Sequence, residues 1–243
     1  MALIAYDDTD ASAFEATRHL RADALAAWRT AIGEHLAPRP GARLLDLGCG
    51  TGSWARAFRS WWPQVEVVAV EPSAAMRERA VFRPVVPGTA ADIPCADDSL
   101  DGAWVSTVIH HVPDLDAAAR ELRRVLKPGA PVLIRSAFAG RHEAISLFRW
   151  FPEAVAVLDS YPSVAAVEEA FAGAGFTTAA CQPVPQVTAA SLAEAAATLR
   201  REAHTPLQLI TDEAYEAGVA RLREAARTET GPVVDALDLL VLR

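Results

Sequence analysis

The chain has 243 residues, 51% of them hydrophobic, so it is long enough to bury the core of one α/β domain without disulfides or metal ions. Its formal net charge of -8 disfavours binding to DNA or RNA, because a nucleic-acid surface needs clustered positive charge. The basic pairs Arg123–Arg124 and Arg200–Arg201 lie among acids and alanines, so we predict that they belong to solvated helix faces. We therefore predict a single domain, residues 1–243, without a nucleic-acid partner.

The three cysteines, Cys49, Cys95 and Cys181, are far apart and form no CxxC pair, which predicts neither a disulfide framework nor a zinc site. The first residues are apolar for only a short stretch and are followed by acids, unlike a signal peptide. No apolar run reaches the ~20 residues that a membrane-spanning helix needs. We expect a cytoplasmic monomer or homodimer with no bound metal and no membrane partner.

In chain order, residues 1–40 form the first predicted element, an N-terminal helical segment, because Ala11–His35 is rich in Ala, Leu, Glu and Arg and ends at PRPG. Short apolar runs then alternate with helical patterns. The predicted strands are Arg43–Leu47, Val65–Val70, Asp101–Ser106 and Ala130–Phe138, with a weaker one at Arg83–Val86. This alternation is typical of a doubly wound, mainly parallel sheet covered by helices on both faces.

The C-terminal half predicts further strands separated by helical insertions. We expect a partly helical stretch at Gly140–Asp159, a helix at Ser163–Ala174, a strand at Phe176–Pro183, two helices within Thr188–Thr228 and a closing strand from Val233. The insertions at residues 140–165 and 188–228 are predicted to form a lid over the sheet.

The stretch LLDLGCGTG places three glycines directly after the first predicted strand. Gly48, Gly50 and Gly52 allow a tight turn and let the backbone come close to a ligand that a Cβ would push away. The helix that follows, SWARAFRSWW, points its free N–H groups at the same gap. A tight structural turn without a ligand is the alternative interpretation of this pattern.

Three later features favour a nucleoside site. Glu71 ends the second central strand, where its carboxylate can bind both hydroxyls of a ribose. Asp92 can accept a hydrogen bond from an exocyclic amine, and the Ile93 N–H is a neighbouring donor. The segment from Ser106 to His111 leaves the next strand at the same carboxyl edge. Each acid alone could belong to a solvated turn, but together they predict a site for an adenosine-like group.

A dinucleotide-binding loop would have a third glycine where this chain has Ser53. Asp46-Leu47-Gly48-Cys49-Gly50-Thr51-Gly52 instead matches the pattern (D/E)xGxGxG, and here the chain resembles the class I S-adenosylmethionine-dependent methyltransferases. The stretches VEVVAVEPSAAM, TAADIPCADDSLDGAWVSTVIHHVPD and ELRRVLKPGAPVLI extend the resemblance, in the order of that family, over Ala42 to Ile134.

The resemblance implies a Rossmann-like sheet of seven strands with the last one antiparallel, and S-adenosylmethionine as cofactor. It also implies roles for individual residues. At the methionine end, Asp46 would orient the cofactor through its ammonium and Ser106 would touch the methionine portion, while Gly48, Gly50 and Gly52 would line the cofactor. At the adenosine end, Glu71 would hold the ribose, Pro72 would flank the adenine, and Asp92 and Ile93 would bind the adenine edge. Tyr6 and Arg18 would close over the cofactor unless they only anchor a helix. Met76 is instead predicted to lie in the core.

Two residues are candidates for chemistry at the acceptor. A histidine is the favoured general base because imidazole titrates near neutral pH, and of the neighbours His110 and His111 only one should face the ligand. The resemblance to the family favours His111. A packing histidine is the alternative. Arg135 lies inside an apolar strand, where a guanidinium needs a partner: either an acid within the fold or an anionic or carbonyl group of the substrate.

The sequence thus predicts methyl transfer from S-adenosylmethionine to a small-molecule acceptor, at carbon, nitrogen or oxygen, with specialised metabolism as the expected setting. A nicotinamide-dependent oxidoreductase is one alternative, disfavoured by Ser53 and by the lack of an evident tyrosine–lysine pair. A protein that binds S-adenosylmethionine, or uses it in a rearrangement, without transferring methyl is the other.

Overall fold

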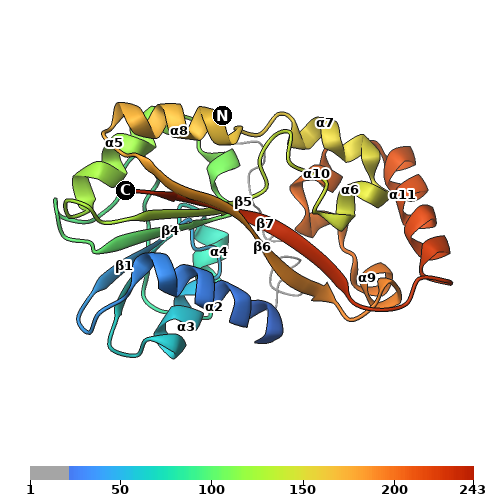
Figure 1. Ribbon diagram of the computed structural model, residues 1–243, viewed down its shortest axis with the longest axis horizontal. Coiled ribbons are helices and arrows are strands. Elements are labelled where there is room, and N and C mark those ends of the chain that lie inside the picture. Colours follow the sequence, from blue (N-terminus) through green and yellow to red (C-terminus); the bar gives the residue numbers. More distant parts are fainter. Residues whose placement is uncertain (1–21) are drawn as a thin grey trace.

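The computed structural model describes residues 22–243 and contains a seven-stranded sheet in the order β3-β2-β1-β4-β5-β7-β6 (Figure 1). The strands are β1 (Arg43–Leu47), β2 (Glu66–Val70), β3 (Val85–Val86), β4 (Gly102–Ser106), β5 (Val132–Ser136), β6 (Thr178–Ala189) and β7 (Val233–Leu242). Neighbours from β3 through β5 are parallel, and β7 runs antiparallel to both β5 and β6. The predicted fold class is therefore confirmed, including the antiparallel last strand.

The largest difference from the predicted strands concerns β6, which we expected to end at Pro183. It continues to Ala189 because it pairs with β7 along its whole length. Pro183 and Pro185 fit within β6 because the strand lies at the edge of the sheet, where a missing N–H leaves no partner unsatisfied. The segment from Thr188 thus begins in this strand rather than in a helix.

Helices cover both faces of the sheet and connect its strands. They are α2 (Ala22–Leu36), α3 (Ser53–Trp61), α4 (Ala74–Glu78), η1 (Ile109–His111), α5 (Leu115–Val125), α6 (Ser146–Trp150), η2 (Pro152–Ala154), α7 (Val155–Leu158), α8 (Val164–Gly173), α9 (Leu192–Thr198), η3 (Arg201–Ala203), α10 (Thr205–Gln208) and α11 (Asp212–Ala225). Hydroxyl or carboxylate side chains cap several of them. Ser163 accepts a hydrogen bond from the Ala166 N–H at the start of α8, as its position before the predicted helix suggested.

Successive residues of the central strands point into two separate cores. In β5, Val132 and Ile134 pack in the core beneath α5 and α8, whereas Leu133 packs in the core beneath α2 and α3. Met76 is buried, so its predicted core position is confirmed. This two-sided burial explains why the strands are almost continuously apolar, and it leaves only their carboxyl ends open for a site.

The long strands β6 and β7 run past the rest of the sheet and carry a group of helices at their far end (Figure 1). We call α6, η2, α7, α9, η3, α10 and α11 the lid region. These helices share a core of their own, which includes Phe148, Phe151 and Leu222. Arg141 binds Asp238 through two hydrogen bonds of 2.7 and 2.8 Å, and so ties the segment before α6 to β7. The buried core of the lid region and the bidentate ion pair between Arg141 and Asp238 hold the lid region against the sheet.

The prediction that the two arginine pairs belong to solvated helix faces holds only in part. Arg123 and Arg124 lie on α5 and Arg200 is exposed, but the Arg124 and Arg201 side chains are partly buried. Arg124 binds four groups around α5, and Arg201 donates to backbone oxygens of Leu207 and Ile210 and to Asp212. Both guanidiniums donate to backbone carbonyls outside regular strands, which ties these segments to the fold. Separately, none of the helices described between residues 22 and 243 has both the length and the apolar character needed to cross a membrane.

Candidate active site

A cavity of about 370 Å³ opens at the carboxyl ends of β1, β4 and β5 and continues into the lid region. Its volume lies at the small end of the range of ligand pockets, roughly 300–1,000 Å³. The strand ends contribute polar residues, among them Asp46, Ser106, His110 and Arg135, and the lid region contributes mostly apolar ones. The structure therefore brings Asp46, Ser106 and Arg135 together with the lid region around one space, whereas Glu71, Pro72, Asp92 and Ile93 are not among its lining residues.

Glu71 ties the glycine turn to the end of β2. One carboxylate oxygen accepts a hydrogen bond from the Gly50 N–H at 2.9 Å, and the other accepts one from the Ser73 N–H at 2.8 Å. The side chain is buried, and this desolvation raises its pKa above the ordinary value, against the lowering effect of the two hydrogen bonds. Gly50 and Glu71, which we predicted to lie at one ligand, are thus in direct contact.

The glycines of this turn serve protein packing as well as the predicted ligand. Gly48, Gly50 and Gly52 all have positive φ angles, so the turn itself requires glycine. A Cβ on Gly48 would lie 2.5 Å from a methyl carbon of Val108, and a Cβ on Gly52 would lie 2.8 Å from the Cβ of Phe82. Of the three, Gly48 lines the cavity. At Gly52 the close neighbour is therefore protein, and its contact with a cofactor stays a prediction.

Asp46 lies at the bottom of the cavity wall, buried in the end of β1. Its carboxyl group receives a hydrogen bond from the Ala55 N–H at the start of α3, while Oδ2 has no hydrogen-bond partner among residues 22–243. Burial, with a smaller contribution from the nearby Glu71, raises the pKa of Asp46 to about 7. A buried acceptor of this kind favours a ligand that brings a donor or a positive charge.

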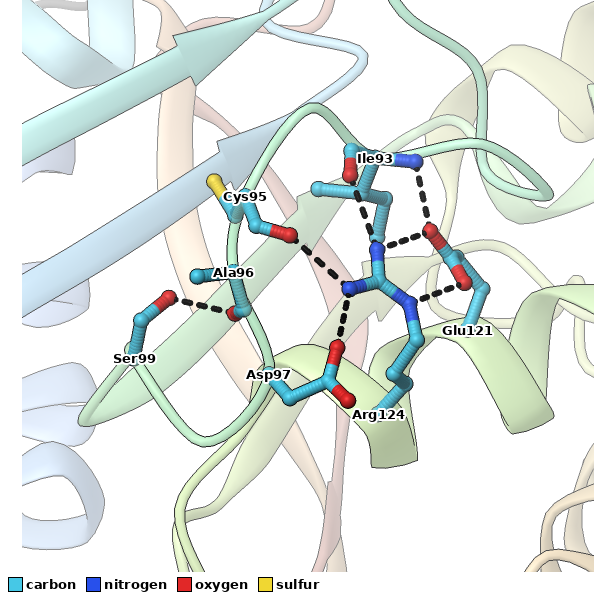
Figure 2. Close-up of polar contacts among 7 residues, drawn as sticks. All are labelled: Ile93, Cys95, Ala96, Asp97, Ser99, Glu121 and Arg124. Carbon is cyan, nitrogen blue, oxygen red and sulfur yellow. Dashed lines mark hydrogen bonds and ion pairs between the residues drawn. The ribbon is translucent and has the colours of Figure 1, made fainter.

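The loop after β3, which we predicted to bind adenine, is anchored to α5 by Arg124 (Figure 2). The Arg124 guanidinium donates to the backbone oxygens of Ile93 at 3.0 Å and Cys95 at 2.9 Å, and it pairs with Asp97 at 2.6 Å and Glu121 at 2.5 Å. Its guanidinium therefore joins the loop to the helix at three points, while Glu121 of the same helix holds the guanidinium in place.

The structure affects the residues that we predicted to bind adenine in different ways. The Ile93 N–H, proposed as a donor to the adenine edge, donates to the Glu121 carboxylate at 2.8 Å, so it is already engaged within the fold. Asp92 is exposed and its backbone N–H pairs with the Thr89 oxygen. Pro72 is also exposed, beside the end of β2. The adenine-edge role of Asp92 and the flanking role of Pro72 stay predictions.

Arg135 and Ser106 meet in the cavity wall. The Arg135 guanidinium donates to the Ser106 hydroxyl and to the Gln186 side-chain oxygen, each at 3.2 Å, and it lies 4.9 Å from the Trp28 ring centroid. Trp28 in turn donates to the same Gln186 oxygen at 2.7 Å. Gln186 lies on β6, beyond the predicted end of that strand, so no sequence pattern pointed to it.

His110, rather than the predicted His111, lines the cavity. Its ring stacks on Tyr161 of the segment after α7, with centroids 4.1 Å apart and an interplanar angle of 2°. The two histidines lie in a short 3-10 turn, and preceding Thr107 has a positive φ of 54°, which redirects the chain after β4. The expectation that only one histidine faces the site fits the structure, but the resemblance to the family favoured the other histidine. Tyr6 and Arg18 lie outside the described residues.

A family model described as a methyltransferase domain matches residues 17–180, more than half of the chain, and the chain therefore belongs to this family. Its architecture is the class I S-adenosylmethionine-dependent methyltransferase fold. The chain is similar to malonyl-(acyl-carrier protein) O-methyltransferase of Serratia marcescens, 34% identical over 124 residues (49% of this chain, 49% of the relative), and to demethylmenaquinone methyltransferase of Roseiflexus sp., 32% identical over 133 residues (51% and 55%).

The chain spans about half the length of these curated relatives. Among solved structures, it resembles a proposed methyltransferase from an antibiotic biosynthesis pathway in Anabaena variabilis, with a TM-score of 0.70 and 20% identity, covering 90% of this chain and 97% of that one. At this identity the likeness shows a shared fold.

The contact between Gly52 and Phe82 predicts a measurable stability difference between two glycine substitutions. Both Gly52 and Gly129 have positive φ, at 81° and 77°, but a Cβ on Gly129 meets no atom of residues 22–243 within 4 Å. Gly52→Ala should therefore lower the free energy of unfolding by about 1–3 kcal/mol more than Gly129→Ala, because only the former adds a clash to the backbone strain. Urea unfolding of both variants measures this, and equal losses would show that Phe82 does not press on the turn.

Burial of Asp46 predicts that Asp46→Asn stabilises the protein at alkaline pH. A folded-state pKa of about 7 against 3.8 unfolded means that folding opposes ionisation, so wild-type stability falls as pH rises between these values and the loss is complete above pH 7. Asn does not ionise. The variant should gain free energy of unfolding at pH 8, with ~4 kcal/mol as the upper limit, and less at pH 5. A variant that is less stable than wild type at pH 8 would contradict this assignment.

The Arg124 contacts predict that Arg124→Met loosens the loop from Ile93 to Asp97. Amide hydrogen exchange in a peptide spanning residues 89–99 should rise roughly tenfold, since about 1.4 kcal/mol of local stability is lost. Arg123→Met is the matched control, because Arg123 donates to Leu126 and Lys127 and not to the loop. Similar exchange in both variants would mean that Arg124 does not hold the loop.

The hydrogen bonds between Arg124 and Glu121 predict how the free energy of unfolding changes at acid pH. Hydrogen bonding to Arg124 is the largest of the effects that lower the pKa of Glu121 below its ordinary 4.5. Wild type should lose this contribution as pH falls through the lowered pKa, and Arg124→Met should show a smaller loss over that range.

Proposed function

We propose that this chain transfers the methyl group of S-adenosylmethionine to a small-molecule acceptor held in the cavity. The observation that carries the proposal is the meeting of Asp46, Ser106, His110 and Arg135 in one cavity wall, beside a glycine turn fastened to Glu71. The methyltransferase-domain family and the names of the two relatives support the reaction class.

The side chains at the strand ends fit the cofactor. Asp46 Oδ2, buried and without a hydrogen bond from the described residues, suits the ammonium of the methionine end. Each Glu71 oxygen accepts one backbone hydrogen bond and retains a second lone pair, which suits the hydroxyls of a ribose. S-adenosylmethionine supplies a methyl group already activated on a sulfonium sulfur.

The work left to the protein is to hold the acceptor in line and to exclude water, which together can contribute ~7–11 kcal/mol. Apolar residues of the lid region, among them Phe148 and Leu192, wall the cavity and keep the site dry. Arg135 presents a guanidinium to a carbonyl or anionic group of the acceptor. For an oxygen or nitrogen acceptor, His110 receives the proton; for a carbon acceptor, the Trp54 ring face can stabilise developing positive charge.

We also propose that the protein acts in the cytoplasm, in specialised metabolism. Three free cysteines, Cys49, Cys95 and Cys181, fit a reducing cytoplasm, and the small apolar cavity fits an acceptor of specialised metabolism. Burial raises the pKa of the Cys49 thiol, so this cavity-lining residue is a packing group and not a nucleophile.

Formation of S-adenosylhomocysteine tests the proposal directly. Wild type should form it with at least one member of a panel of alcohols, carboxylic acids, amines and electron-rich arenes. His110→Ala should lower turnover by roughly 10²–10⁴ without weakening cofactor binding, while the matched control His111→Ala should change turnover little. The reverse pattern would restore His111 as the base.

Cofactor binding provides a separate measurement. Asp46→Asn should weaken the binding of S-adenosylmethionine roughly tenfold to a hundredfold by calorimetry, because a charge-assisted contact worth about 1.5–3 kcal/mol is lost. Tight binding without product across the whole panel would favour the alternative of a cofactor-binding protein that does not transfer methyl. Binding of a nicotinamide cofactor in place of S-adenosylmethionine would overturn the proposal.

A further inference from the structure

The cavity has a polar end and an apolar end. At the strand ends it is lined by Asp46, Ser106, His110 and Arg135. The residues that the lid region and the segment before it contribute are mostly apolar, among them Leu147, Phe148, Phe151, Leu192 and Leu222, with Ser146, Thr198, His204 and Thr205 as polar exceptions. Thr188 of β6 and Asp235 of β7 also line the cavity, and both are hydrogen-bonded within the fold. An apolar wall gains free energy only when it covers an apolar ligand surface.

Building on the proposed function, we propose that the acceptor is an amphiphile, with its reacting group at the polar end and an apolar body extending into the lid region. We further propose that Gly218 of α11 sets how long that body can be, by giving the Phe151 ring a place to lie outside the cavity.

The close approach of the Phe151 ring to Gly218 supports the proposed role of this glycine. A Cβ built on this glycine would lie 2.1 Å from Cδ1 and 2.3 Å from Cε1 of Phe151, distances that no real Cβ shows. The ring therefore occupies the position into which any side chain at residue 218 would project. It also stacks on Tyr215, one helical turn earlier on α11, with centroids 5.8 Å apart and an interplanar angle of 22°.

Phe151 is a cavity-lining residue that is itself fully buried. Leu222, one helical turn after Gly218 on α11, lines the same cavity, so the Phe151 ring forms part of the cavity wall on the side of α11. Gly218 lies within an alanine-rich helix, DEAYEAGVARLREA, where alanine would be more favourable by about 0.5–1 kcal/mol. Glycine at this position lowers the stability of α11, but it leaves room for the Phe151 ring. Because that ring lines the cavity, the residue at position 218 affects the shape of the cavity.

Two opposite substitutions separate this role from simple packing. Gly218→Ala forces the ring away from α11 and should shorten the cavity. Phe151→Leu removes much of the ring and should lengthen it. In the double variant the alanine Cβ meets no ring, so the cavity should return toward its wild-type length. Gly173→Ala on α8 is the matched control, because within the described part of the chain a Cβ there meets no atom within 4 Å.

The probe is a series of straight-chain carboxylic acids of about 4 to 16 carbons, titrated by calorimetry against protein saturated with S-adenosylmethionine. In wild type the affinity should rise roughly fourfold per methylene up to a limiting length and then fall. The limit should move to shorter chains in Gly218→Ala, to longer chains in Phe151→Leu, and stay unchanged in Gly173→Ala. A thermal melt of each variant shows whether it folds, and Phe151→Leu alone tests the limit should Gly218→Ala unfold.

Affinity that does not depend on chain length would overturn the amphiphile, and an unchanged limit in both single variants would overturn the role of Gly218. The titration of S-adenosylmethionine in the same samples keeps these results apart from the proposed function. Chains that bind with the expected length dependence to a protein that does not bind S-adenosylmethionine would support the shape of the cavity and reject methyl transfer.

Discussion

The buried carboxylate of Glu71 is the constraint on which the arrangement of the site depends. It fixes the Gly50 N–H of one strand end and the Ser73 N–H of the next with its two oxygens, so the turn after β1 cannot move independently of β2. Removing this carboxylate would leave buried backbone donors unsatisfied. Because the turn also positions Asp46 and the start of α3, a single acid holds three elements of the cavity wall in register.

Much of the fold and part of the site could be predicted from the sequence because they depend on local patterns. Apolar runs of strand length marked β1, β2, β4 and β5, and a serine before an alanine-rich run marked the start of α8. Glu71 and Arg135 were singled out by their positions at the end of or inside such runs, whereas the roles predicted for Asp46 and Ser106 came from the resemblance to the methyltransferase family. The choice between His110 and His111 did not follow, since Thr107 leaves the strand with a left-handed conformation that no pattern announced. Gln186 and the Phe151 ring beside Gly218 are long-range contacts, which only the packed chain reveals.

The glycines of the turn after β1 can be required for more than one physical reason. Its positive φ angles require glycine for the turn, and Val108 and Phe82 occupy the room that absent side chains leave at Gly48 and Gly52. The same room was attributed to a ligand when only the sequence was considered. Packing and ligand approach are compatible at Gly48, which both contacts Val108 and lines the cavity, so a glycine there serves two surfaces at once.

The distribution of buried charge connects the fold to its chemistry. Asp46 and Glu71 each have a pKa raised by burial, and Glu71 raises that of Asp46 further, so folding opposes the ionised form of both acids. A core built for stability alone would replace such groups with apolar ones. A ligand that brings a positive charge to Asp46 reverses this unfavourable balance, because it stabilises the ionised carboxylate that folding disfavours. In the proposed function, the free energy that folding loses at Asp46 is therefore regained when a cationic group binds there.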